Sequence, residues 1–161
     1  MNNFESTYRE NYPKMFRIAV KMVNDKDVTS DIVQEVFVYY FEKLQNGHTV
    51  HHPQSWLIRA TVNQCVDYLK KRKKHTPLSA ANDLSDEEDT FEIQQPDAIL
   101  KQAIAKLKPL EMKLIMLYSE GYSYKEIAQI ADINFSSVGK TLSRTLLKLK
   151  GILKRLNDEM Y

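Results

Sequence analysis

A row of polar side chains gives the segment between residues 56 and 74 the chemistry of single-stranded DNA binding. Its members stand three or four residues apart, so they share one face of a helix: Arg59, Asn63, Asp67, Lys70 and Lys74. Trp56 lies at the N-terminal end of this segment, next to a loop predicted over residues 46–52. Cations bind phosphates and aromatic rings stack on unpaired bases, so the combination favours a DNA strand as the ligand. The alternatives are a solvated lysine run and a Trp56 side chain packed in the core.

The sharpest motif lies near the C-terminus, in residues 123–145. Ser123 and Glu126 have the spacing of a capping box, in which each side chain accepts a hydrogen bond from the other residue's backbone amide. A turn at Asp132 and a second helix over about residues 135–155 complete the apolar spacing of a helix-turn-helix. Six polar residues of the second helix are predicted to contact duplex DNA, the first five in the major groove: Ser136, Ser137, Lys140, Thr141, Arg144 and Lys148. The alternative for this region is a purely structural pair of helices.

The elements that must position these residues are helices. Apolar residues recur every three or four positions over about residues 3–23, 27–44 and 53–74, and Pro13 is expected to bend or divide the first helix. The second helix also has a polar face, which either binds a basic protein or is an ordinary solvated surface. This face carries Asp31, Gln34 and Glu35, with Val38 beside them.

Charged residues are unevenly distributed along the chain, although its net charge is only +2. Residues 51–75 have six Lys and Arg against one Asp, and residues 97–161 have eleven against seven acidic residues. Residues 76–96 have six Asp and Glu, no Lys or Arg, and too few apolar residues to fold alone. Basic regions bind polyanions through phosphates. We therefore expect an all-α protein of two small helical domains, 1–75 and 97–161, whose flexible acidic linker lets them separate when idle.

Other classes of function are excluded by what the 161 residues contain. Cys65 is the single cysteine, so a disulfide framework and a thiol-rich metal site are excluded, and we expect Cys65 in the core. Three histidines, His48, His51 and His52, lie in one loop without a fourth ligand, so we expect no metal ion and no cofactor. The chain has no paired nucleophile and base and no phosphate-binding loop, so we expect no enzyme. No apolar run suffices for a membrane span or a signal peptide, which indicates a cytoplasmic protein.

The order of these parts resembles the extracytoplasmic-function (ECF) sigma factors of bacterial RNA polymerase. Residues 31–37, Asp-Ile-Val-Gln-Glu-Val-Phe, resemble the segment with which such factors bind the clamp helices of the largest polymerase subunit. Residues 56–70, from Trp-Leu-Ile-Arg-Ala to Asp-Tyr-Leu-Lys, resemble the helix that melts and binds the minus-ten promoter element. Leu-Lys-Pro at 107–109 and the stretch 121–128 resemble the start of the domain that binds the minus-thirty-five element.

The resemblance implies that core RNA polymerase and promoter DNA are the partners. Asp31, Gln34 and Glu35 would contact the polymerase, and an anti-sigma factor is often a further partner in this family. The chain departs from the family at Lys140-Thr141, where a Ser-Arg pair is usual, whereas Arg144 agrees with it. The alternative is a conventional helix-turn-helix regulator that binds duplex DNA as a dimer.

Overall fold

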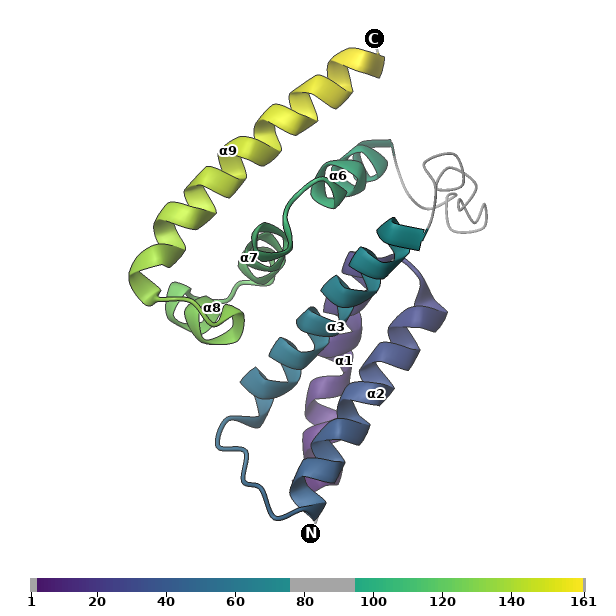
Figure 1. The fold of residues 1–161 in the computed structure, drawn as a ribbon, viewed down its shortest axis with the longest axis vertical. Helices are drawn as coiled ribbons and strands as arrows, with labels where there is room; N and C mark the ends of the chain where they lie inside the picture. The colour runs from purple at the N-terminus through teal and green to yellow at the C-terminus, as the bar shows by residue number, and fades with distance from the viewer. Residues whose placement is uncertain (1–2, 76–94, 161) are drawn as a thin grey trace.

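The structure, a computed structural model, describes residues 3–75 and 95–160. Its N-terminal part has three helices, α1 (Asn3–Val23), α2 (Lys26–Gln45) and α3 (Pro53–His75). Its C-terminal part has four, α6 (Gln95–Ala105), α7 (Pro109–Ser119), α8 (Tyr124–Ala131) and α9 (Phe135–Met160), as Figure 1 shows. No strand occurs in the two described ranges, and the all-α prediction is confirmed. The predicted linker over 76–96 lies outside the described residues, except for its last two positions, which begin α6.

The N-terminal helices pack against one another as a three-helix bundle. Each contributes side chains with no exposed surface, such as Ile18 of α1, Val36 of α2 and Ile58 of α3, all at 0%. α2 begins after Asp25, whose carboxylate accepts a hydrogen bond from the Val28 amide at 3.1 Å. The bundle therefore holds the surfaces of α2 and α3 in fixed positions.

Pro13 lies inside α1, which continues past it, so of the two predicted effects, a bend or a division, the division is wrong. A proline in a helix removes one backbone hydrogen bond. Three residues in the turns after it, Met15, Ile18 and Ala19, are fully buried at 0% exposure. Their packing against α2 and α3 outweighs the missing hydrogen bond, so α1 continues to Val23.

The C-terminal helices bury Leu114 of α7, Ile127 of α8 and Leu142 of α9, each with at most 1% of its surface exposed. The capping box at the start of α8 is confirmed. The Ser123 amide donates to the Glu126 carboxylate at 2.8 Å, and the Glu126 amide donates to the Ser123 hydroxyl at 3.1 Å. This cap sets the first residue of α8 and therefore the position of the turn that follows.

The turn of the helix-turn-helix lies at Asp132, as expected. Its backbone is left-handed, with φ 61° and ψ 49°, a conformation that glycine adopts more readily. α9 then continues to Met160, beyond its expected end near residue 155, because Ile152 is still buried at 3% exposure and Leu156 packs against the core.

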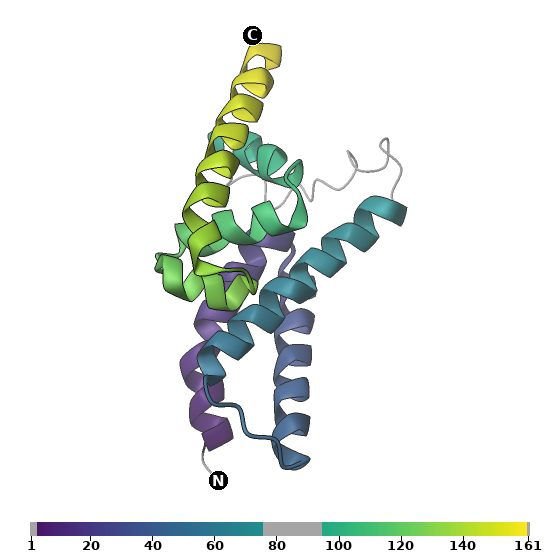
Figure 2. The same ribbon diagram turned by 60° about the vertical axis from the view of Figure 1, so that its left-hand side comes forward.

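The two parts of the chain are in contact. α3 lies against α8 and α7, and Figure 2 shows these helices side by side. The sequence led us to expect domains that separate when idle, whereas the structure shows a closed arrangement. This arrangement decides which of the predicted binding residues are accessible.

Candidate nucleic-acid interface

The N-terminal half of α9 presents the residues predicted to contact duplex DNA. Four of the six are exposed and two are half-exposed: Ser136, Lys140, Arg144 and Lys148, then Ser137 and Thr141. Val138 and Leu142, with 0% and 1% of their surfaces exposed, lie on the side of α9 that faces the core. The structure therefore brings all six polar residues to the outer side of one helix.

Lys148 already has a partner within its own domain. Its ammonium group contacts Oε1 of Glu111, at the start of α7, at 2.9 Å, and the Lys108 amide donates to the same oxygen at 2.8 Å. Partial burial acts to raise the pKa of Glu111, but these hydrogen bonds outweigh it and the pKa is lowered. Lys140 and Arg144, in contrast, form no ion pair with any residue of the ranges 3–75 and 95–160. Among the six predicted residues, these two are the cations without a competing ion pair.

The row predicted to bind a single strand lies on the side of α3 that faces the C-terminal domain. Nη2 of Arg59 is 2.9 Å from Oδ2 of Asp132, in the turn before α9. Lys113 of α7 approaches the same row. Removal from water lowers the pKa of Lys113, with Asp67 opposing this effect and Lys70 adding to it. We call Arg59, Asn63, Asp67 and Lys70 the α3 polar row. Arg59 contacts the C-terminal domain, whereas Asp67 and Lys70 are exposed.

Trp56 lies at the edge of the core. Its ring centroid is 5.7 Å from that of Tyr40, and its side chain is only partly exposed. Trp56 therefore packs against the core in this structure, which is the alternative to DNA binding that the sequence left open. Asn63 is also partly buried, and the side chain of Lys74 lies outside the part of the chain that the structure describes.

The acidic face of α2 is exposed, away from the bundle. Asp31, Gln34 and Glu35 all lie on it, and Val38 beside them is 52% exposed. Phe41, one turn further on, is 43% exposed and extends this surface. The sequence analysis missed Phe41, because a single aromatic residue outside the core stripe does not by itself indicate a ligand.

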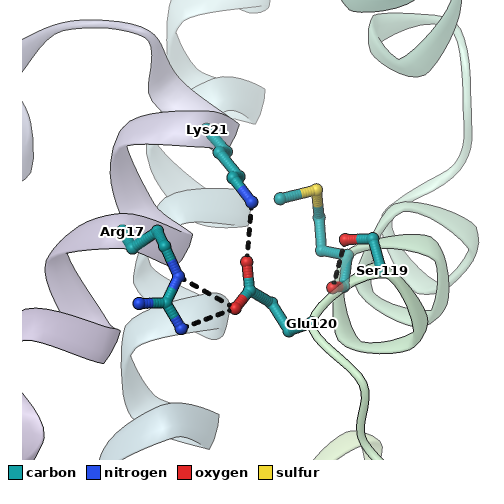
Figure 3. Close-up of polar contacts among 5 residues, drawn as sticks. Arg17, Lys21, Ser119 and Glu120 are labelled. Atoms are coloured by element: carbon teal, nitrogen blue, oxygen red, sulfur yellow. Dashed lines mark hydrogen bonds and ion pairs between the residues drawn. The ribbon is translucent and has the colours of Figure 1, made fainter.

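A cluster of charges between the two domains was not predicted. Glu120, directly after α7, accepts hydrogen bonds from Nε and Nη2 of Arg17 at 3.1 Å and 2.9 Å, and from Nζ of Lys21 at 2.8 Å, as drawn in Figure 3. The Glu120 side chain is only 4% exposed. These partners are 103 and 99 positions away in the sequence, so no local spacing could indicate them. We call Glu120, Arg17 and Lys21 the Glu120 cluster.

The described residues contain no arrangement typical of a metal centre. Within residues 3–75 and 95–160, no group of three or more His, Cys, Asp or Glu side chains could hold a metal ion. No helix in those ranges is both long enough and apolar enough to cross a membrane. Cys65 is buried, as expected, and burial raises its pKa to about 12, so its reactive thiolate is absent at neutral pH.

Two family profiles match the chain, Sigma-70 region 2 over residues 7–75 and Sigma-70, region 4 over residues 97–149. The ECF RNA polymerase sigma factor SigM of Bacillus subtilis (strain 168) is 26% identical over 155 residues, which cover 90% of this chain and 92% of that protein. The chain belongs to the ECF sigma factors. The RNA polymerase sigma factor YlaC of the same organism is 23% identical over 170 residues, covering 98% of this chain and 96% of that protein.

The fold of this ECF sigma factor is also found in a solved structure. The sigma factor RpoE from Bartonella quintana, in complex with the anti-sigma factor NepR, superposes with a TM-score of 0.63 at 18% identity. The alignment covers 96% of this chain and 98% of that chain. The family resemblance is thus confirmed, and this ECF sigma factor is a promoter-specificity factor that binds RNA polymerase. The dimeric regulator considered as the alternative is not favoured.

Proposed function

We propose that this sigma factor uses three separate surfaces for three contacts. The acidic face of α2 binds the clamp helices of core RNA polymerase, the α3 polar row binds the opened minus-ten strand, and α9 binds the minus-thirty-five duplex. The observation that carries the proposal is the separation of unlike surfaces on one chain, acidic on α2 and cationic on α9. The polymerase performs the chemistry, so the sigma factor itself is no enzyme, and it acts in the cytoplasm.

Binding of duplex DNA depends mainly on Lys140 and Arg144. Both are exposed and stand four residues apart on the outer side of α9. Arginine can donate two hydrogen bonds to the edge of guanine, and a good pair of this kind contributes ~1–3 kcal/mol of discrimination. Ser137 and Thr141 lie on the same side and have hydroxyl groups for phosphates or bases. Lys148 can also bind a phosphate if its ammonium group gives up the contact with the Glu111 carboxylate.

Binding of the opened strand depends on Arg59, Asn63 and Lys70, with Trp56 and Lys74 at the two ends of the row. Extruding a base costs a few kcal/mol. Contacts of phosphates with the cations, and stacking worth about 1–3 kcal/mol per base, offset this cost. Arg59 must first give up its ion pair with Asp132, in which the two side chains are 42% and 79% exposed.

Binding of core polymerase depends on Asp31, Gln34 and Glu35. The carboxylates provide negative charge, and Val38 and Phe41 supply apolar surface beside them. Such a face suits a partner with basic and apolar side chains, which we propose to be the clamp helices of the largest subunit. This acidic face is exposed in the closed arrangement, so polymerase can reach it before the domains separate.

We place the domain borders at 1–75 and 97–161, with residues 76–96 as the linker. The matches to region 2 and region 4, which end at 75 and begin at 97, support these borders. We also propose an anti-sigma factor as a partner. Its support is the family resemblance and the relative from Bartonella quintana, which was solved with such a factor.

The test of the proposed function is a gel-shift experiment with purified core polymerase. We expect the protein to migrate with core polymerase on a native gel and to bind promoter duplex specifically in that complex. A protein that ignores core polymerase, and binds alone to two half-sites about ten base pairs apart, would instead be a dimeric regulator.

A further inference from the structure

The first residue of α9 is an exposed aromatic residue, Phe135, which the sequence analysis did not assign to DNA. Phe135 is 61% exposed, more than any other aromatic residue in the ranges 3–75 and 95–160. Burial of a phenylalanine ring stabilises a folded chain, yet α9 presents this ring to solvent. A single exposed apolar residue is ordinary on a protein surface. The position of Phe135 in the helix-turn-helix is what indicates a ligand.

Phe135 lies at the end of α9 that a helix-turn-helix directs into the major groove. It stands three residues after the turn at Asp132 and begins the helix that carries Lys140 and Arg144. The N-terminal residues of such a helix contact the edges of the bases. Phe135 and Arg144 are nine residues apart, which is about 13.5 Å along α9 and about the length of four base pairs. One promoter element can therefore contact both residues.

The described part of α9 leaves the Phe135 ring uncovered. Side chains of a helix point back toward its N-terminus, so the side chain four positions later would lie over Phe135. That residue is Gly139, which has no side chain. The side-chain atom nearest to the place of a Cβ at Gly139 is Cε2 of Tyr124, 3.4 Å away. Phe135 also forms no ring contact with another aromatic residue of the described ranges, so its ring can meet a ligand from outside the chain.

The major groove offers one apolar group to such a ring. All four bases present hydrogen-bond donors or acceptors there, and thymine alone adds a methyl group, at C5. Contact between this methyl group and an apolar side chain removes both from water, which is favourable. The phenylalanine ring has no hydrogen-bonding group with which to recognise the polar edges of the other bases. Thymine is therefore the base that the exposed ring fits.

We propose that Phe135 contacts the C5 methyl group of a thymine in the minus-thirty-five element and so selects thymine at one position. This inference rests on the proposed binding of α9 to that element, and it names one base that α9 recognises. Lys140 and Arg144 contact phosphates and guanine through their charges and hydrogen bonds. Phe135 adds discrimination by an apolar contact, which the cations cannot supply.

The test replaces thymine with deoxyuridine, which differs only in lacking the C5 methyl group. Labelled duplexes of a promoter that the protein directs carry this replacement at one minus-thirty-five thymine at a time, on either strand. Binding by the complex of sigma factor and core polymerase is measured by fluorescence anisotropy at fixed salt concentration. For the wild type we expect one replacement to weaken binding about fourfold, which corresponds to ~0.8 kcal/mol for one buried carbon group.

The decisive variant is Phe135→Ala, which should bind the thymine and deoxyuridine duplexes equally at that position. Phe135→Leu retains an apolar side chain and should keep part of the preference for thymine. Leu147→Ala is the matched control, because Leu147 is also apolar and is 71% exposed but lies about 18 Å further along α9. Its preference for thymine should equal that of the wild type. Circular dichroism and co-migration with core polymerase confirm that each variant is folded and binds polymerase.

Three results would overturn the inference. The wild type could bind every deoxyuridine duplex as tightly as the unmodified promoter, or the minus-thirty-five element could contain no A·T pair. A preference for thymine that persists in Phe135→Ala would come from the shape of the DNA and not from this ring. In each of these cases, specific binding of the unmodified promoter leaves the proposed function of α9 standing. A complex that binds no promoter duplex specifically would show that both are wrong.

Discussion

Replacing Arg144 with alanine should remove one DNA contact and leave the fold unchanged. Arg144 is exposed and forms no ion pair with a described residue, so its loss leaves no buried group unpaired. It is the tenth residue of α9, on the side opposite to buried Leu142. A contact in which arginine donates twice to guanine contributes ~1–3 kcal/mol. Its loss should therefore weaken promoter binding roughly 5- to 150-fold.

The assay is fluorescence anisotropy of a labelled promoter duplex titrated with the complex of sigma factor and core polymerase. The salt concentration is held fixed, because phosphate contacts make the affinity salt-dependent. Lys154→Ala is the control, since Lys154 is also exposed but lies about 15 Å further along α9. Equal losses in the two variants, or a loss of polymerase binding by Arg144→Ala, would refute a groove contact by Arg144.

Three further predictions concern other parts of the chain. Glu35→Lys should weaken co-migration with core polymerase at least about tenfold, because it opposes the expected charge of the partner, and unchanged co-migration would contradict the role of α2. Burial acts to raise the pKa of Glu120, but the hydrogen bonds from Arg17 and Lys21 outweigh it and lower the pKa. The stabilisation of the closed arrangement by Glu120 is therefore present above the ordinary value of 4.5 and is lost as the pH falls through the lowered pKa. Förster resonance energy transfer between dyes on the two domains should fall over that pH range in the wild type, and Glu120→Gln should abolish this dependence. Ser123→Ala removes a helix cap worth about 0.5–2 kcal/mol, so Tm measured by circular dichroism should fall, and Ser123→Asp should restore it.

Local spacing was sufficient to predict the three N-terminal helices and the helix-turn-helix with its turn. The second helix was expected over 27–44 and spans Lys26–Gln45. The turn at Asp132 could be predicted because the capping box and the spacing of apolar residues both depend only on residues nearby in the sequence. The helix is not divided at Pro13, one of its two predicted effects, because the packing that keeps α1 continuous comes from other helices.

The closed arrangement could not be predicted from local spacing. Arg17 and Glu120 are 103 positions apart, and a charged residue on a helix has the same local pattern whether it meets water or another domain. The partner of Arg59 could not be predicted from local spacing either. Its place in a cationic row predicts a DNA contact, whereas in this structure its partner is Asp132.

Run-off transcription over a library of genomic fragments tests most directly that this sigma factor directs promoter recognition. The reaction contains purified core polymerase with or without the protein. We predict discrete transcripts that appear only with the protein and that share common minus-ten and minus-thirty-five elements upstream of their starts. Identical transcripts in both reactions would contradict the assignment, even if the protein alone still bound duplex DNA.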